Sequence, residues 1–318
     1  MTGVKEERLF AALDGGGSST RAVLFDASGK VLSLATGGAS NPNDVGEEAS
    51  ARLLADLLLR AGADRAERIF CGVSGATGHE KKLEQALEAV FPGSAVTVRS
   101  DIFNLLSRLP SEDGAALVCG TGSGCFVRHG GVLTRVGGWG WLIDGDCGGG
   151  YALARAGLEA AYAALDGRGP ETSLLAAAEE FLGGRPDEKL GKIYEGGKPF
   201  IASFAPNVAA AAASGDAAAL SAVKRTAAGL AGYLRVALRE LGEGFSCVCG
   251  GGLFEEPFFR RSFLFAVAQA GIPAGLDFVS GPPIAGAAAA ALKESGISPD
   301  AGFFGRFEKD YRFLESRQ

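Results

Sequence analysis

Short apolar runs separated by glycine-rich turns dominate the first hundred residues. Three of these runs predict β-strands joined by tight turns, and they cover residues 9–14, 20–26 and 31–36. Leucines then recur at helical spacing between residues 45 and 61, and Gly62 follows where a helix C-cap residue belongs. Further strands are predicted at 68–73 and 95–99, and further helices at 79–90 and about 100–110. The pattern predicts a βββαβαβα unit.

The same pattern of strands and glycine turns begins again near residue 115. A strand at 115–119, a turn at 120–124 and strands at 125–129 and 132–136 repeat the opening of the chain. A helical block intervenes, with helices predicted at 151–165, 171–182, 200–213 and 216–241. The remaining elements are a strand at 245–249, a helix at 255–270, a short strand near Phe278, a small-residue helix at 283–292 and an amphipathic tail at 303–314. The repetition predicts two related α/β domains.

The composition fits two folded domains and excludes several classes of protein. The 318 residues include 49 glycines, roughly twice the usual share. The length exceeds the roughly 250 residues at which single cores usually stop growing. Apolar stretches are far shorter than the ~20 residues of a membrane helix, and the N-terminus lacks the pattern of a secretory signal. We therefore expect a cytoplasmic protein without a membrane partner.

The net charge and the few cysteines and histidines argue against several kinds of partner and site. The net charge is −6 and no Lys/Arg run appears, which argues against a nucleic-acid partner. Six cysteines without a CxxC and only two histidines predict neither a disulfide framework, nor a zinc site, nor a Ser/His/Asp triad. An anionic substrate would therefore be held by glycine-rich backbone or by a metal ion.

Three glycine clusters directly follow apolar runs, at residues 14–18, 120–123 and 250–252. Glycine permits positive φ angles and a close backbone approach, so successive N–H groups can converge on phosphate oxygens. The alternative is a set of tight hairpin turns without a ligand. No GKS or GKT follows any cluster, and the first two lead into strands where a Rossmann fingerprint requires a helix. The pattern favours phosphate-binding β-hairpins, to which hydroxyls of Ser18, Ser19, Thr20 and Thr121 would add donors.

Two aspartates end predicted strands. Asp14 stands beside the first glycine cluster, where a carboxylate would repel phosphate unless a cation lay between them. This position predicts Mg²⁺, held through water, with a solvated turn aspartate as the alternative. Asp101 follows the strand at 95–99, at the sheet edge where α/β proteins place ligand chemistry. It is a candidate acceptor of a hydroxyl proton and equally a helix N-cap, and the two roles can coexist.

A sugar-binding function is suggested by two further segments. Asn41, before Pro42, offers both a donor and an acceptor to a polyol, although a plain Asn-Pro turn explains it as well. The segment 137–150 gathers both tryptophans, Asp144, Asp146 and a second glycine run. Tryptophan faces pack on sugar C–H surfaces while carboxylates accept hydroxyl protons. Core tryptophans beside a flexible loop would give the same composition without a ligand.

The motifs DGGGSSTRAVLFD, ASNPN, SDIF, CGTGSG, GGWGW, DGDCGGGY and CGGGLFEE occur in this order over nearly the whole chain. Together they resemble the N-acetylglucosamine kinase-like branch of the BadF/BadG/BcrA/BcrD ATPase family, in the actin, Hsp70 and sugar kinase superfamily. The order of several motifs is much more specific than any single glycine run.

The resemblance implies two RNase H-like domains of the actin/hexokinase type, with a nucleotide and sugar cleft between them. Residues 1–110 and a C-terminal helix at 300–318 would form the smaller domain, and 111–299 the larger. The implied ATP-binding residues are Gly15, Gly16, Gly17, Ser18, Ser19, Thr20, Arg21, Gly120, Thr121, Gly122, Gly250, Gly251 and Gly252. The implied sugar-binding residues are Asn41, Asp101, Ser123, Gly138, Trp139, Gly140 and Asp146. Asp101 would be the catalytic base at the 6-hydroxyl, and Asp14 would face Mg²⁺.

The chain departs from the family pattern at two positions. The family commonly has Gly-Asp-Glu-Gly where this chain reads Asp144-Gly145-Asp146-Cys147-Gly148, so Asp146 is our choice of sugar ligand and Asp144 its rival. Gly124 replaces an asparagine of relatives of the human type. The expected activity is ATP-dependent phosphorylation of an amino sugar, N-acetylglucosamine or glucosamine. An iron–sulfur ATPase activating a CoA-ester dehydratase or reductase, and a non-catalytic sugar sensor, are alternatives; whether the chain forms a homodimer stays open.

Overall fold

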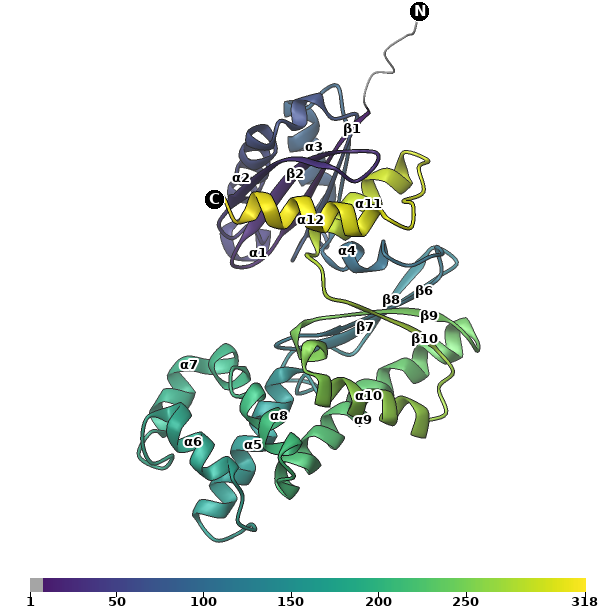
Figure 1. Cartoon of the computed structure of the whole chain (residues 1–318). Coiled ribbons are helices and arrows are strands. Elements are labelled where there is room, and N and C mark those ends of the chain that lie inside the picture. Colours follow the sequence, from purple (N-terminus) through teal and green to yellow (C-terminus); the bar gives the residue numbers. More distant parts are fainter. Residues whose placement is uncertain (1–7) are drawn as a thin grey trace, which may run out of the picture. The chain divides into compact units, whose positions relative to one another are not determined.

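The computed structural model of the chain describes residues 8–318 and divides into two compact units. Unit 1 consists of the chain up to Arg108 together with Gly281–Gln318, and unit 2 consists of Leu109–Ser280. Figure 1 labels the elements of both. The sequence-based boundary at residue 300 differs from this division, because helix α11 (Ile284–Glu294) packs on strands of unit 1.

Unit 1 contains a five-stranded sheet in the order β3-β2-β1-β4-β5. Its strands are β1 (Leu9–Gly15), β2 (Thr20–Asp26), β3 (Val31–Gly37), β4 (Arg68–Val73) and β5 (Ala95–Ser100). The first three strands form an antiparallel meander, whereas β4 and β5 run parallel to β1. Successive β1 residues face opposite sides, so that Ala11 and Leu13 enter one core cluster and Phe10 and Ala12 the other. A sheet buried on both faces needs helices on both.

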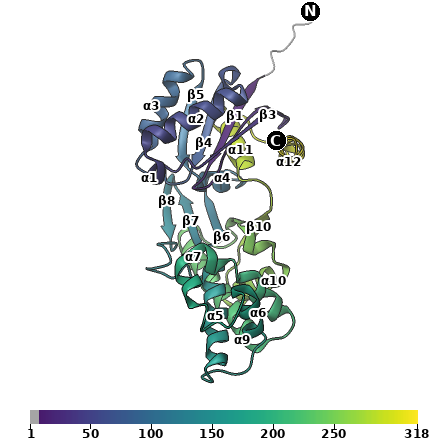
Figure 2. The ribbon, with the colours of Figure 1, turned by 90° about the vertical axis from the view of Figure 1, so that its left-hand side faces the viewer.

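Helices cover both faces of the unit 1 sheet, as Figure 2 shows. One face carries α2 (Glu47–Ala61) and α3 (Glu80–Val90), and the other carries α11 and α12 (Phe303–Glu315). Two short helices, α1 (Pro42–Val45) and α4 (Ile102–Leu106), follow β3 and β5. The nearly all-alanine α11 lets its backbone approach the sheet closely, while α12 packs its aromatic residues against Phe25.

Unit 2 repeats the strand order of unit 1. Its sheet runs β10-β9-β6-β7-β8, with β6 (Gly114–Cys119), β7 (Ser123–His129), β8 (Val132–Val136), β9 (Ser246–Gly250) and β10 (Gly275–Val279). As in unit 1, three strands form an antiparallel meander and two more run parallel to the first. The predicted internal repeat and the α/β class are therefore confirmed.

Six helices complete unit 2 (Figure 1). They are α5 (Gly150–Leu165), α6 (Leu174–Leu182), α7 (Leu190–Ala202), α8 (Ala205–Ala213), α9 (Ala217–Leu241) and α10 (Pro257–Gln269). The sequence pattern missed most of α7, because Gly196, Gly197 and Pro199 are helix breakers. The structure accommodates them with a kink at Gly197, whose φ is 57°. Within residues 8–318, no helix has the length and apolar character needed to cross a membrane.

Candidate functional site

The first glycine loop joins β1 to β2 in unit 1. The N–H of Gly16 donates to the Ser19 carbonyl (2.9 Å), and the N–H of Ser40 donates to the Gly16 carbonyl (3.0 Å). Within residues 8–318, no acceptor is found for the N–H groups of Gly17 or Ser18. The loop is therefore a tight turn that leaves backbone donors available.

Two side chains that follow this loop are already engaged. Thr20 is fully buried, and its hydroxyl donates to the Gly38 carbonyl (2.8 Å). The guanidinium of Arg21 donates to the Ser19 hydroxyl (2.9 Å) and lies 3.5 Å from the Glu315 carboxylate. Thr20 thus fixes the strand that leaves the loop, while the charge of Arg21 partly offsets the rise in the pKa of Asp14 that burial causes.

Asp14 and Asp101 meet at one edge of the unit 1 sheet. The parallel register places Gly15 beside Val73, and Val73 beside Ser100. Asp14 precedes Gly15 and Asp101 follows Ser100, so both aspartates lie at this edge. The pKa of Asp14 is raised from 3.8 to about 6, chiefly by burial and to a smaller extent by the charge of Asp101, against the lowering effect of a hydrogen bond from Asn104. That bond runs from the Asn104 amide to the Asp14 carboxylate (2.7 Å). Sequence reasoning missed Asn104, which is 1% exposed.

Asp101 lies directly after β5, at the start of α4. It occupies the N-cap position of this helix but makes no side-chain capping hydrogen bond to it. The Ser100 hydroxyl donates to its carboxylate (3.2 Å). The residue is exposed, yet its surroundings desolvate the carboxylate enough to raise its pKa. An accessible carboxylate of raised pKa suits a proton acceptor.

The second glycine loop, 120–122, joins β6 to β7 in unit 2 and rests on the first turn of α5. The N–H of Gly150 donates to the Gly120 carbonyl (2.8 Å), and the N–H of Tyr151 donates to the Thr121 carbonyl (2.9 Å). In a planar trans peptide the carbonyl and the following N–H point in opposite directions. The N–H groups of Thr121 and Gly122 therefore point away from α5, and the described chain offers them no acceptor.

Asp146 lies beneath this second loop. It is 3% exposed and is the one described non-glycine residue with a positive φ, 47°. One carboxylate oxygen accepts from the N–H of Ser123 (3.4 Å), and the other lies 2.6 Å from the ammonium of Lys198 on α7. Sequence reasoning did not identify Lys198. The carboxylate that we expected to contact a sugar is thus buried and paired.

Ser123, Asp144 and the tryptophans complete this region. The Ser123 hydroxyl accepts from the N–H of Gly148 (3.0 Å) and is nearly buried. Burial raises the pKa of Asp144, but hydrogen bonds from the N–H groups of Trp139 and Asp146 outweigh this effect and lower it overall. Trp139 is 58% exposed and Trp141 is 40% exposed, so neither is a core residue. Gly138 and Gly140, on either side of Trp139, both have positive φ.

The third cluster and Asn41 have clear structural roles. Gly251 has a φ of 117°, and a Cβ there would collide with the Cys119 carbonyl, so close packing of β9 on β6 requires glycine. Gly250 ends β9, and Gly252 faces open space. Asn41 caps α1, because its side-chain oxygen accepts from the N–H of Asn43 (3.0 Å). A structural role does not exclude a ligand contact at these positions.

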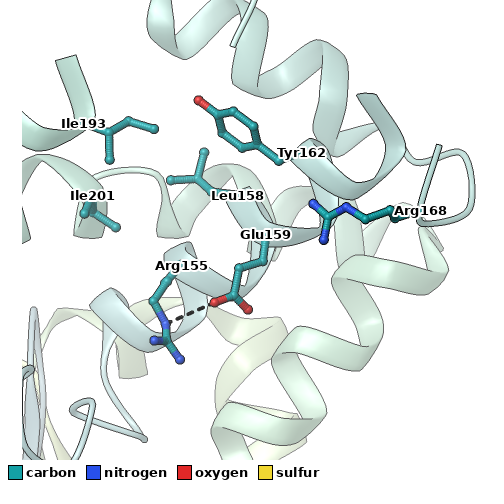
Figure 3. A pocket seen from close by; sticks show the side chains of 7 residues that line it. All are labelled: Arg155, Leu158, Glu159, Tyr162, Arg168, Ile193 and Ile201. Atoms are coloured by element: carbon teal, nitrogen blue, oxygen red, sulfur yellow. Dashed lines mark ion pairs between the residues drawn. The ribbon is translucent and has the colours of Figure 1, made fainter. Parts of the chain in front are cut away.

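A pocket of about 270 Å³ opens elsewhere in unit 2, among the helices of its insert (Figure 3). It is lined by Arg155, Leu158, Glu159, Tyr162, Arg168, Ile193 and Ile201. None of the predicted site residues lines it. Its two arginines are paired with Glu159 and Asp166, so no uncompensated charge marks it as an anion site.

Comparison with known proteins identifies the family of the chain. The BadF/BadG/BcrA/BcrD ATPase family model matches residues 13–292. The chain belongs to this family. The predicted resemblance is therefore confirmed over most of the chain.

Relatives of this family member are named as amino-sugar kinases. An N-acetylmuramic acid/N-acetylglucosamine kinase of Clostridium acetobutylicum is 31% identical over 217 residues, 64% of this chain and 71% of that protein. A glucosamine kinase of Vibrio cholerae is 26% identical over 249 residues, 76% of this chain and 84% of that protein. The chain also matches the structure of a candidate N-acetylglucosamine kinase from Chromobacterium violaceum with a TM-score of 0.68, at 24% identity and over 88% and 98% of the two chains. The predicted sugar-kinase fold and enzyme class are confirmed by these matches.

Proposed function

We propose that this member of the BadF/BadG/BcrA/BcrD family transfers the terminal phosphoryl group of ATP to the 6-hydroxyl of an amino sugar. The observation that carries the proposal is the arrangement in unit 1, where two carboxylates of raised pKa stand beside a glycine loop with unpaired N–H groups. Phosphoryl transfer requires little covalent chemistry from the protein, which mainly positions groups and balances charge. The relatives' names support an amino sugar as the acceptor.

The glycine loops are assigned to the nucleotide. Unpaired N–H groups in the loops at 15–19 and 120–122 would donate to phosphate oxygens, and 250–252 would lie on the adenosine side. Asp14 fits Mg²⁺, because it is a largely buried carboxylate whose raised pKa reflects too little compensating positive charge. Mg²⁺ typically binds one or two carboxylates, nucleotide phosphates and several waters, and would neutralise the charge on the phosphates. Asn104 orients the Asp14 carboxylate through its 2.7 Å hydrogen bond.

Asp101 is assigned as the general base. Its carboxylate is exposed at the sheet edge and would accept the proton of the attacking hydroxyl. Burial raises its pKa, which makes it a better proton acceptor than an ordinary aspartate. The Ser100 hydroxyl, which donates to the same carboxylate, holds it in one orientation.

The candidate sugar contacts fall into exposed residues and residues that already have a partner within the protein. Asn41, Gly138, Trp139 and Gly140 stay candidates, and the exposed face of Trp139 suits packing against a pyranose ring. Ser123 and Asp146 are engaged within unit 2, so a direct sugar contact by either requires the exchange of an existing partner. Asp144, the rival of Asp146, is more accessible.

The proposal is tested by measuring ADP release from Mg-ATP with N-acetylglucosamine, glucosamine, N-acetylmuramic acid and glucose as acceptors. We expect turnover with an amino sugar and a product phosphorylated on the 6-oxygen. In Asp101→Asn, turnover should fall about 10²–10⁴-fold, the usual contribution of a general base. ATP affinity measured by calorimetry should stay within about twofold. Full activity of Asp101→Asn would refute the assigned base, and no ADP release with any acceptor would refute the function.

A further inference from the structure

Lys198 is a cation whose position the reaction outlined above leaves unexplained. It lies on α7, immediately after the kink at Gly197 and before Pro199. Its ammonium contacts the Asp146 carboxylate at 2.6 Å, and both head groups lie beside the Cα of Gly122, where a Cβ would be 3.1 Å from the ammonium. Helix α7 thus places one positive charge beside the second glycine loop.

The ion pair leaves two donors of the ammonium available. An ammonium carries three N–H donors, and the 2.6 Å contact with the Asp146 carboxylate engages one of them. Within residues 8–318, no other acceptor is found for the remaining two. The Asp146 side chain is 5% exposed, whereas that of Lys198 is 25% exposed. The carboxylate is therefore buried behind a lysine that solvent, or a ligand, can still reach.

We infer that Lys198 supplies the positive charge for the nucleotide phosphate that the N–H groups of Thr121 and Gly122 are proposed to bind, so that the three form one subsite. The inference rests on the proposed function for the identity of the anion. The two loop carbonyls are tied to α5, which turns both N–H groups away from that helix. These fixed dipoles and one ammonium supply the donors and the positive charge that a phosphate requires.

Asp146 acts in this subsite as a positioning residue. Its carboxylate links the loop to α7, through the N–H of Ser123 on one side and Lys198 on the other. Gly122 must be glycine here, because a Cβ would lie only 2.7 Å from the Asp146 carboxylate. This arrangement gives Asp146 a role different from the sugar contact expected from its sequence motif.

The test compares Lys198→Met, Lys198→Arg and Lys224→Met with the parent protein. Lys224 is exposed on α9 of the same unit and makes no described contact, so its substitution removes one charge without touching the loop. A charge-assisted hydrogen bond contributes roughly 1.5–3 kcal/mol, and about 1.4 kcal/mol corresponds to tenfold. Lys198→Met should therefore weaken ADP binding, measured by calorimetry, roughly 10- to 100-fold.

Three comparisons distinguish a phosphate contact of Lys198 from a purely structural role as the ion-pair partner of Asp146. The KM for ATP should rise in Lys198→Met while the KM for the sugar stays within about twofold, Lys198→Arg should recover most of the affinity, and Lys224→Met should behave as the parent. ADP affinity equal to the parent's in folded Lys198→Met, or no recovery of affinity in Lys198→Arg, overturns the inference.

A measurement on the parent protein covers the case in which Lys198→Met does not fold. Acetylation of lysines by an N-hydroxysuccinimide ester, read by mass spectrometry, should be slowed at Lys198 by saturating Mg-ADP but not at Lys224. Unchanged Lys198 reactivity refutes the subsite. If the parent phosphorylates no sugar but Lys198 is still protected by ADP, the subsite stands and the proposed function fails.

Discussion

Replacing Asp14 by asparagine should make the protein more stable and less active. Burial raises the pKa of Asp14 from 3.8 to about 6. Because the folded state holds the proton more tightly than the unfolded state does, the stability of the parent falls as the pH rises from about 4 to about 6. It then stays reduced at higher pH. The amide that replaces the carboxylate carries no charge, so the Asp14→Asn protein should escape this fall.

The size of the effect follows from that shift. A difference of about two pKa units corresponds to roughly 3 kcal/mol in the free energy of unfolding at pH 8. This value already includes the hydrogen bond from Asn104, which an asparagine oxygen at position 14 can still accept. The gain at pH 8 should therefore be about 3 kcal/mol, or a rise of roughly 6–12 °C in the melting temperature of a domain of this size.

The assay is thermal and urea denaturation of the parent and Asp14→Asn at half-unit steps from pH 4 to pH 8. The stability difference should grow between pH 4 and pH 6 and then stay constant, while sugar phosphorylation with Mg-ATP falls at least 100-fold. Asp64→Asn, which removes an exposed carboxylate of unit 1, is the matched control and should show neither change. A variant no more stable than the parent at pH 8, or a stability difference independent of pH, would show that the pKa of Asp14 is not raised in the folded protein.

Two further substitutions test the packing of unit 2. Gly251→Ala should lower the free energy of unfolding by at least about 2 kcal/mol, because it places a Cβ against the Cys119 carbonyl at a positive φ. Gly252→Ala, at an open position, should leave the melting temperature nearly unchanged in the same thermal melts. Asp216 caps α9 and accepts hydrogen bonds from Ala219, Thr172 and Ser173, which outweigh burial and lower its pKa to about 2. The contribution of the ionised Asp216 carboxylate to the free energy of unfolding should be present above about pH 4 and lost between pH 4 and pH 2. At neutral pH both Asp216→Ala and Asp216→Asn lose the stabilisation that depends on the carboxylate charge, but only asparagine keeps an acceptor for the N–H of Ala219. Asp216→Ala should therefore be less stable than Asp216→Asn by about 1 kcal/mol, and equal losses in the two would contradict the capping role.

The repeat of strand, glycine turn, strand and strand could be predicted from the sequence because it depends on local signals. Alternating apolar positions and glycines report directly on strands and turns, and the strands of both sheets occur along the chain in the predicted succession. Helix α7 could not be predicted in the same way, since Gly197 and Pro199 break a local helix pattern and only tertiary packing restores it. The assignment of α11 to unit 1 likewise depends on contacts with β1 and β4, far away in sequence.

The same distinction applies to the candidate site. Asp14 and Asp101 could be proposed because each ends a strand, and parallel strands bring such residues to one edge. Asn104 and Lys198 gave no comparable signal. Each acts through a partner about 50 or more residues away, Asn104 on Asp14 and Lys198 on Asp146. Residues that orient other residues are found from contacts, whereas strand ends are found from pattern.

The two glycine loops differ in the charge placed beside them, and this difference argues for unequal roles. In each loop a carbonyl accepts a hydrogen bond from its own unit, Gly16 from Ser40 and Gly120 from α5, and in the part of the chain that the structure describes no acceptor is found for the backbone N–H groups that follow. Beside the first loop stands Asp14, whereas the corresponding strand end in unit 2 is the buried thiol of Cys119. Unit 2 instead receives an ammonium from its helical insert. A phosphate can approach the second loop directly, but it approaches the first only with a cation that offsets the carboxylate. Omission of Mg²⁺ should therefore weaken ADP binding more in the parent than in Asp14→Asn, and an equal Mg²⁺ dependence would refute this division of roles.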